Sequence, residues 1–300
     1  MSHVPAPIAL FVYNRPEHTR RTLDALLRNP EAKDSDLFIF SDGPKNDEAA
    51  PTVGRVRQEL RRVSGVRSVS ITERERNLGL AASVTDGVSR LCAKYGRAIV
   101  LEDDLLIAPG FLEFMNLALN RYADEERVMQ ISGYMYPGEF GGPGDTLFLP
   151  MISCWGWATW KRAWDRYDPT MAGYEVLRGD RVLRKRFDLG GAYDYFGMLK
   201  RQAAGEIDSW GIRWHLSVFM HNGLVLYPAK SMVRNIGVDG SGTHSGSAAL
   251  QRKLSAEPEP APIRFPTRLG TDEHAFARVA ADLRAMRRGL LARLIGRFMA

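Results

Sequence analysis

Three consecutive acidic residues, Glu102, Asp103 and Asp104, directly follow the apolar run from Ala98 to Leu101. Carboxylates this close together at a strand end repel one another and lose water, which raises their pKa values unless a cation lies among them. A hard divalent ion such as Mn²⁺ or Mg²⁺ is the natural partner, and such ions are commonly held by one or two carboxylates plus the phosphates of a substrate. The triplet therefore indicates a metal-bound diphosphate, with Asp104 as the metal ligand. The alternative is a solvated acidic turn that caps the next helix.

Two further charged residues stand where strands are expected to end. The chain contains no GxGxxG after its first strand and no GxxxxGK[ST], so the sequence supports neither a dinucleotide-binding fold nor a P-loop. A bound phosphate then needs other positive charges, and Arg15, directly after the first strand, joins the metal in that role. Asp42 ends the second strand and could accept a hydrogen bond from a base or a ribose. The alternative for Asp42 is a structural role in the turn before Gly43 and Pro44.

Short apolar or β-branched runs alternate with amphipathic stretches, a pattern typical of βαβ units around a mainly parallel sheet. Open sheets of this kind bind ligands at the carboxyl ends of their strands, which is where the residues above are expected to lie. We therefore predict an α/β fold with a Rossmann-like, mainly parallel central sheet flanked by helices. The predicted strands are residues 8–13, 37–40, 66–71, 98–101 and 129–132. One predicted helix begins at Pro16, and three others cover 52–63, 80–94 and 110–122.

Aromatic residues gather in the second half of the chain, beyond a Gly- and Pro-rich seam at 137–144. Five of the six tryptophans lie between Trp155 and Trp210. Their faces suit stacking on a sugar ring, and we choose Trp155 as the contact because it stands at the expected entry of a loop. Plain core packing is the alternative for each tryptophan.

A glycine-rich loop follows at 235–246, with four glycines and His244 near its end. This composition predicts a lid that closes over a bound diphosphate, in which His244 would contact a phosphate or complete the metal shell. An exposed loop histidine is the alternative. The seams divide the chain into a first half at 1–136, an acceptor-side half of the same domain at 137–254, and a linker with a tail at 255–300.

The net charge of +6 comes almost entirely from the tail, because residues 277–300 contain six arginines and one acid. The body is nearly neutral, which argues against a nucleic-acid-binding face. Apolar residues from Val279 to Phe298 recur at steps of three or four, so the tail predicts a basic amphipathic helix. Such a helix can lie on an anionic membrane surface. The alternative is packing on the body or on a second subunit.

The two cysteines, Cys92 and Cys154, have no CxxC spacing and are expected to be reduced thiols. The start of the chain has no basic n-region, and its first apolar run is far too short to span a membrane. These features together predict a cytoplasmic protein, peripheral at the inner face of the membrane if the tail binds there.

Several motifs occur in an order that resembles a known family. They are Tyr13-Asn14-Arg15-Pro16, Ser41-Asp42-Gly43, Asn77-Leu78-Gly79, Glu102-Asp103-Asp104 and Ile131-Ser132-Gly133. In this order they resemble the nucleotide-sugar-binding half of GT-A glycosyltransferases, and most of all N-acetylglucosaminyltransferase I and related bacterial surface-polysaccharide enzymes. The resemblance covers about residues 7–246.

The resemblance implies a role for each matching residue. Arg15 would contact the nucleotide diphosphate, Asp42 the uracil, Glu102 and Asp103 the sugar or ribose, and Asp104 the metal. Asn14 and Asn77, from neighbouring motifs, would also bind the nucleotide sugar.

The segment Glu206 to Gly211 is similar to the acidic-Trp segment that supplies the family's catalytic base, except that Ser209 stands where a second acid is usual. We favour Asp208 over Glu206 as the base, because Asp208 lies two residues before Trp210. The alternative role for an acidic residue at this position is to cap the following helix.

The resemblance thus predicts a metal-dependent transferase that moves a sugar from a UDP-sugar to a hydroxyl of a glycan or a lipid-linked acceptor, with inversion. Asp208 would remove the hydroxyl proton while the metal and Arg15 stabilise the leaving diphosphate. The alternatives are a retaining transferase, a sugar-nucleotide pyrophosphorylase, and a non-catalytic protein that binds nucleotide sugars or glycans.

Overall fold

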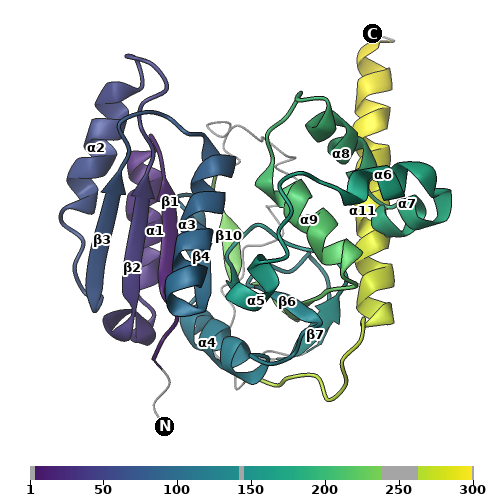
Figure 1. Ribbon diagram of the computed structural model, residues 1–300, viewed down its shortest axis with the longest axis horizontal. Coiled ribbons are helices and arrows are strands. Elements are labelled where there is room, and N and C mark those ends of the chain that lie inside the picture. Colours follow the sequence, from purple (N-terminus) through teal and green to yellow (C-terminus); the bar gives the residue numbers. More distant parts are fainter. Residues whose placement is uncertain (1–3, 142–144, 238–262, 299–300) are drawn as a thin grey trace.

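The computed structural model describes residues 4–141, 145–237 and 263–298, with side chains through residue 285. Its main feature is an eight-stranded sheet in the order β3-β2-β1-β4-β8-β6-β9-β7 (Figure 1). The first four strands in this order are parallel to one another. They are β3 (Ser68–Glu73), β2 (Asp36–Ser41), β1 (Ile8–Val12) and β4 (Arg97–Glu102). The predicted α/β fold with a mainly parallel central sheet is confirmed.

The other half of the sheet comes from later in the chain. Strand β8 (Trp157–Trp160) runs antiparallel to both of its neighbours, β4 and β6 (Val128–Ser132). Strand β9 (Leu224–Pro228) is parallel to β6, and β7 (Thr146–Leu149) closes the edge antiparallel to β9. A separate antiparallel pair joins β5 (Leu105–Ile107) to β10 (Val233–Asn235).

The central strands are apolar throughout because both faces of the sheet are covered. All five residues of β1 are buried, as expected for a parallel strand between two helical layers. Helix α3 (Leu80–Tyr95) packs on β1 and β4 and lies in front of them in Figure 1, while α1 (Pro16–Leu27) lies behind. Helix α2 (Ala50–Leu60) packs on α1, and α4 (Phe111–Arg121) packs on β8 and β6. The short helix η1 (Pro30–Asp34) contacts α1 and α4.

A second group of helices lies beside the sheet and has a small core of its own. It comprises α6 (Gly173–Gly179), α7 (Arg181–Phe187), α8 (Tyr195–Ala203) and α9 (Trp210–Met220), and η2 (Leu189–Gly191) directly follows α7. The core of this group contains Leu177, Phe187, Leu199, Ile212 and Leu216. Because four short helices cannot bury much surface alone, they depend on one another and on the sheet for stability.

Four of the tryptophans pack together between the sheet and this helical group. Trp157 of β8 stacks on Trp210 of α9 with ring centroids 5.1 Å apart, and it also contacts Trp164 of α5 (Lys161–Trp164). Trp164 in turn contacts Trp214 at 5.1 Å. Each of the four is at most 4% exposed, so core packing accounts for them.

The tail begins as a packed helix. Helix α11 spans Glu273–Phe298, so it starts four residues before the predicted tail. Val279 and Leu283 were expected on its membrane-facing stripe, but they are 0% and 5% exposed and belong to the main core. The packing alternative therefore holds for this first part of the helix. In the described part of the chain, no helix is both long enough and apolar enough to cross a bilayer.

Candidate functional site

The ends of three neighbouring strands bring the predicted residues to one edge of the sheet. In the pairing register, Phe11 of β1 lies between Phe40 of β2 and Glu102 of β4. Arg15 follows β1, Asp42 follows β2, and the acidic triplet begins with the last residue of β4. Parallel strands all end on the same side of a sheet, which explains why residues nearly ninety positions apart in sequence meet here.

Arg15 binds two of the three acidic residues. Its guanidinium forms a close ion pair with Asp103 Oδ1 and lies 3.1 Å from Asp104 Oδ2. The Tyr13 backbone N–H donates to Asp103 Oδ2 at 3.3 Å, and the Thr22 hydroxyl donates to the Asp103 carbonyl at 2.8 Å. The Asp103 side chain is only 4% exposed, so this cluster is held from both β1 and α1.

Burial has the largest effect on the pKa values of Glu102 and Asp103. It raises the pKa of Asp103 to about 6, against the lowering effect of Arg15. Burial also raises the pKa of Glu102, and the charges of Asp104 and Asp103 raise it further. The sequence predicted this upward direction from repulsion and desolvation. A single guanidinium thus faces three carboxyl groups, and the site retains an excess of negative charge.

One carboxylate oxygen of Asp104 has no hydrogen-bond partner in the part of the protein that the structure describes. Its Oδ2 faces Arg15, while Oδ1 is buried and has no hydrogen-bond partner among the described residues. Buried carboxylate oxygens without partners are costly, and they are common where a ligand completes the site. The described residues contain no group of three potential metal-binding side chains. A site with one such open oxygen fits an ion that takes most of its ligands from substrate and water.

Gly237 lies directly over this cluster. Apart from the high glycine content of the loop, nothing in the sequence predicts that this residue matters. The Ile236 backbone N–H donates to the Asp104 carbonyl at 2.8 Å, which draws the chain after β10 across the site. A Cβ at Gly237 would lie 2.1 Å from Asp104 Oδ2 and 2.7 Å from Arg15 Nη1. Only glycine leaves room for that ion pair. His244, predicted to act from the same loop, lies outside the described residues.

Asp42 has a different environment. Its carboxylate accepts hydrogen bonds from the backbone N–H groups of Gly43, Leu78 and Gly79, each at 2.9 Å. The Asn77 side chain donates to the Gly43 carbonyl, also at 2.9 Å. Asp42 and Asn77 therefore tie the turn after β2 to the loop before α3. The structure shows the structural role that was the alternative for Asp42, and its contact with uracil stays a prediction.

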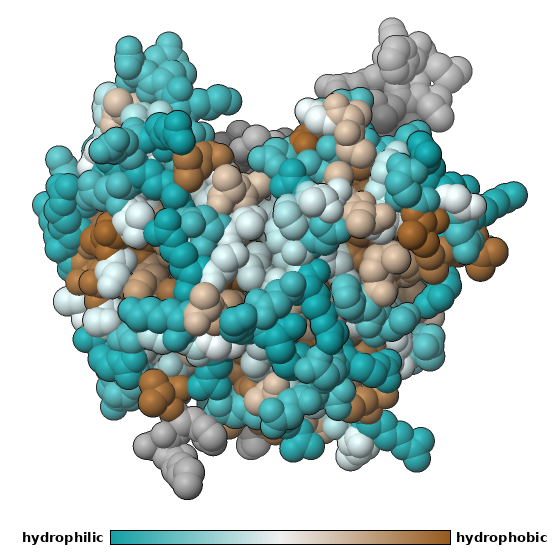
Figure 2. All heavy atoms as spheres, in the orientation of Figure 1, coloured by the Kyte–Doolittle hydropathy of each residue, from teal (hydrophilic) through white to brown (hydrophobic). Residues whose placement is uncertain are grey.

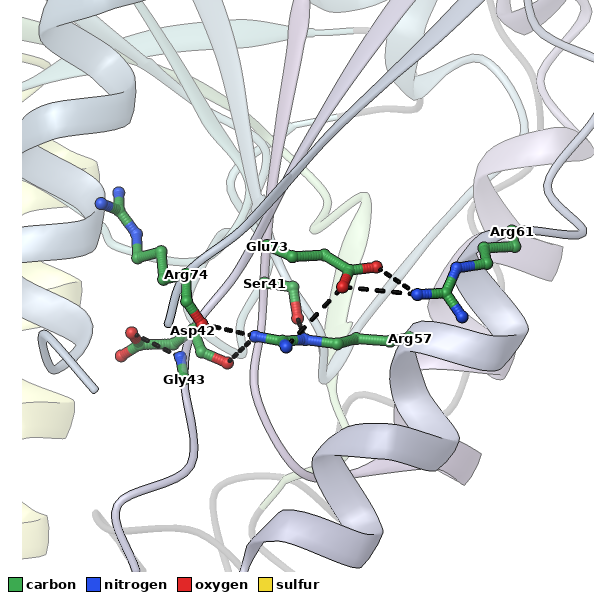
Figure 3. A network of polar contacts seen from close by, with 7 residues as sticks. All are labelled: Ser41, Asp42, Gly43, Arg57, Arg61, Glu73 and Arg74. Atoms are coloured by element: carbon green, nitrogen blue, oxygen red, sulfur yellow. Dashed lines mark hydrogen bonds and ion pairs between the residues drawn. The ribbon is translucent and has the colours of Figure 1, made fainter. Parts of the chain in front are cut away.

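Arg57 extends from α2 toward this pair of loops and contacts both of them (Figure 3). Its guanidinium donates to the Arg74 carbonyl at 2.7 Å, to the Asp42 carbonyl at 3.4 Å and to the Ser41 hydroxyl at 3.3 Å. Glu73 lies 3.7 Å away and also pairs with the exposed Arg61. Sequence reasoning missed Arg57, because one arginine in a basic helix carries no signal of where it points.

Trp155 and Cys154 lie between the acidic edge and the helical group. Trp155 is half-buried and packs edge-on against Tyr134 with ring centroids 4.6 Å apart. Burial raises the pKa of the Cys154 thiol, and the nearby Glu102 charge raises it further. A Cβ at Gly211 would lie 2.8 Å from Cys154 Sγ. Cys154 therefore connects the end of β4 to the first turn of α9.

Asp208 stands just before α9, where Ser209 caps the helix. Its side chain is 61% exposed, and its Oδ1 lies 3.0 Å from Arg213 Nη2. Glu206, the other candidate base, is equally exposed and pairs with Arg201 at 3.5 Å. Asp208 also lines an open pocket of about 360 Å³ between α3 and α9, whose other lining residues are Ala81, Ala82, Thr85, Asp86, Ser89, Tyr167, Pro169 and Arg213. Asp208 therefore lines this pocket, whereas Glu206 does not.

Asn14 occupies the bend between β1 and α1 and is half-buried. It precedes Arg15 at the acidic edge, so its position agrees with a ligand contact. The role of Asn14 in binding a nucleotide sugar stays a prediction.

No family model and no curated protein sequence matches the chain. Among solved structures, GalNAc-T7 with UDP, GalNAc and Mn²⁺ matches with a TM-score of 0.50 and 10% identity, over 78% of this chain and 44% of that one. The chain has a GT-A-like fold. The fold that the motif order predicted is confirmed.

Two further solved structures match parts of the chain. The mannosyltransferase PcManGT from Pyrobaculum calidifontis, in complex with GDP-Man and Mn²⁺, is 13% identical, with a TM-score of 0.34 over 53% of this chain and 45% of that one. TarS of S. aureus is 12% identical, with a TM-score of 0.40 over 74% and 36%. The chain spans less than half the length of each of these three proteins.

Proposed function

We propose that this protein is a glycosyltransferase that transfers a sugar from a nucleotide sugar, with UDP as the nucleotide, to a hydroxyl group of an acceptor. The observation that carries the proposal is the buried edge where Arg15 faces Asp103 and Asp104 and one Asp104 oxygen is left without a partner. The GT-A-like fold, shared with a protein solved with UDP, GalNAc and Mn²⁺, supports the same conclusion.

A divalent ion, Mn²⁺ or Mg²⁺, fits this edge through Asp104. When bound there, such an ion supplies positive charge to the diphosphate as it becomes the leaving group. Arg15 is the protein's own contribution to that charge, and it is already fixed in place by the carboxylates beside it. Glu102 and Asp103 would accept hydrogen bonds from the sugar or ribose hydroxyls.

The acceptor would approach from the pocket between α3 and α9. Asp208 lines that pocket and is exposed, so it can receive a proton from a bound hydroxyl. In this mechanism the acceptor oxygen attacks the anomeric carbon while Asp208 takes its proton, and the bond to the diphosphate breaks with inversion. Trp155 is proposed to flank the sugar, and Asp42 and Asn77 to hold the loops around the base.

The acceptor is proposed to be a glycan or a lipid-linked sugar, used in the synthesis of a surface polysaccharide. The reaction would take place in the cytoplasm, at or near the inner face of the membrane.

The direct test measures UDP release from a panel of UDP-sugars, with Mn²⁺ and with excess chelator. We expect release that needs the metal, and a loss of about 100-fold or more in kcat for Asp208→Asn with unchanged affinity for UDP. Glu206→Gln is the matched control and should keep full turnover. Near-full turnover of Asp208→Asn would favour a retaining mechanism. Formation of pyrophosphate from a sugar phosphate would favour a pyrophosphorylase, and UDP binding without turnover would favour a non-catalytic binding protein.

A further inference from the structure

Helix α7 has two faces of opposite character. Phe187 is fully buried in the core of the helical group and Leu183 packs against that core. The opposite face presents Arg181, Val182, Lys185 and Arg186, which recur at helical spacing and are all exposed. Val182 is 73% exposed, the highest value among the exposed large apolar residues. We call these four residues the α7 face.

The cations of the α7 face differ from the exposed arginines of the neighbouring helices α6 and α8. Among the described residues, Arg181, Lys185 and Arg186 form no ion pair, whereas Arg178 pairs with Glu175 at 2.7 Å and Arg201 with Glu206 at 3.5 Å. Residues 181–186 include four basic residues and no acidic one. Arg186 also lies over the ring of Phe219, with 5.8 Å between the guanidinium carbon and the ring centroid. Within the described part of the chain, no acid forms an ion pair with the cations of this face.

An exposed apolar residue on the neighbouring helix extends the same surface. Val176 of α6 is 50% exposed, and α6 packs directly on α7. In Figure 2 hydrophobic atoms lie at the right-hand edge over α6 and α7, flanked by hydrophilic ones. Arg184 is not part of this surface, because its guanidinium donates to the Leu177 carbonyl at 3.2 Å and joins the two helices.

The basic tail is connected to this region. Helix α11 contacts η2, which directly follows α7. A Cβ at Gly190 of η2 would lie 3.3 Å from Arg284 Nη2. From residue 284 to the end, the chain contains five arginines and no acid. Two strongly basic segments, distant in sequence, thus start from the same side of the molecule.

We propose that the α7 face docks on an anionic lipid bilayer, with Val182 and Val176 entering the boundary between headgroups and acyl chains and the three cations meeting the lipid phosphates. Charge alone would suit any polyanion, but exposed valines between cations gain free energy only where an apolar medium is available. Basic residues at an anionic surface contribute about 1 kcal/mol each, or about fivefold in affinity. This docking surface does not depend on the proposed enzyme activity.

The test is co-sedimentation of the full chain with vesicles of phosphatidylcholine alone and of equimolar phosphatidylcholine and phosphatidylglycerol. We expect binding to the anionic vesicles that weakens with salt. The variant R181Q/K185Q/R186Q should lose about 100-fold in its partition coefficient, because three charges leave the surface. Val182→Gln, which keeps every charge, should lose about fivefold.

A matched control removes the same number of charges elsewhere. Arg20, Arg62 and Arg67 are exposed and pair with acids on α1, α2 and β2, respectively. The variant R20Q/R62Q/R67Q has the same net charge as the test variant and should bind anionic vesicles nearly as well as the wild type. Thermal melts and circular dichroism spectra of each variant show whether the fold is intact.

Three results would overturn the proposal. Equal losses in both triple variants would mean that only net charge matters. Wild-type binding by R181Q/K185Q/R186Q would place the membrane contact elsewhere. Full binding by Val182→Gln, together with equally tight binding to heparin in solution, would identify the α7 face as a site for a soluble polyanion instead.

Discussion

Asp42 and Asp104 are both buried carboxylates that follow strands of the same parallel sheet, yet the protein treats them differently. Asp42 accepts three backbone hydrogen bonds and is fully used by the fold. Asp104 shares Arg15 with Asp103 and keeps one buried oxygen without a partner. Burial of a carboxylate therefore says little about function by itself. The informative property is whether the carboxylate oxygens have hydrogen-bond partners. A buried oxygen without a partner costs stability and contributes nothing to the fold.

The largest effect is expected from Asp104→Asn. Removing the negative charge of Asp104 should lower kcat/KM for UDP-sugar turnover by about 1,000-fold, since charge on the leaving diphosphate is no longer offset. Its free energy of unfolding should stay the same or rise, because one of three neighbouring like charges is gone. Turnover assays and urea denaturation measure the two quantities. A variant as active as the wild type would contradict the role of Asp104.

Asp42→Asn should show the converse behaviour. Its side chain would present an NH₂ group to backbone N–H donors, so we expect a loss of about 2 kcal/mol in the free energy of unfolding. Turnover of the folded fraction should fall by no more than about tenfold, because the carboxylate acts through the fold. If Asp42→Asn were inactive but as stable as the wild type, Asp42 would have to contact the substrate directly.

Gly237→Ala tests the space above Asp104. A methyl group would meet both Asp104 Oδ2 and Arg15 Nη1, so the ion pair or the crossing segment must shift. We expect the affinity for UDP with Mn²⁺, measured by calorimetry, to fall by about tenfold. Gly54→Ala is the matched control, because a Cβ there meets nothing within 4 Å. Equal affinities for the two variants would show that the segment after β10 adapts at no cost.

Arg57→Ala tests the loops around Asp42, which the Arg57 guanidinium joins. It leaves the carbonyls of Asp42 and Arg74 without their donor, and we expect a loss of about 2 kcal/mol in stability and a rise in the Kd for UDP of severalfold. Arg61→Ala, which removes the exposed partner of Glu73, should change stability by less than about 0.5 kcal/mol. The two variants are compared by denaturation and by UDP titration. Loss of stability with an unchanged Kd would limit Arg57 to a purely structural role.

The last effect concerns stability alone and comes from His215, a buried histidine of α9. Burial lowers the pKa of His215 to about 4, whereas a histidine in the unfolded chain has its ordinary pKa of 6.5. Between these values the unfolded state binds the proton and the folded state does not, so stability is full above about pH 6.5 and falls as the pH drops toward 4. The total loss is about 3 kcal/mol. His215→Phe should remove this part of the pH dependence, and an unchanged slope would assign it to other groups.

The first half of the fold could be predicted because its strands are continuous apolar runs. The predicted strand at 8–13 became Ile8–Val12, and the predicted helix at 80–94 became Leu80–Tyr95. These elements are buried on both faces or on one clear stripe, so their pattern is visible locally. The short helices α6 and α7 and the pair β5 and β10 were not predicted. Their packing depends on contacts between distant segments, and seven or three residues carry too little periodicity to show it.

The site was predictable in part for the same reason. Arg15, Asp103 and Asp104 follow strands, and the sheet topology alone brings them together. Gly237 and Arg57 were missed, because their importance comes from a close approach and from a side-chain direction that only the folded chain defines. The tail was predicted as a helix from its spacing, but burial of Val279 required knowledge of what lay beside it.

The order of strands has a consequence for any attempt to divide this protein. Strand β8, from the later part of the chain, fills the gap between β4 and β6 from the earlier part. A fragment ending at residue 136 would expose the unpaired edges of both strands, which invites self-association. The two portions of the chain interleave in one sheet, so the protein must be expressed and engineered as a single piece.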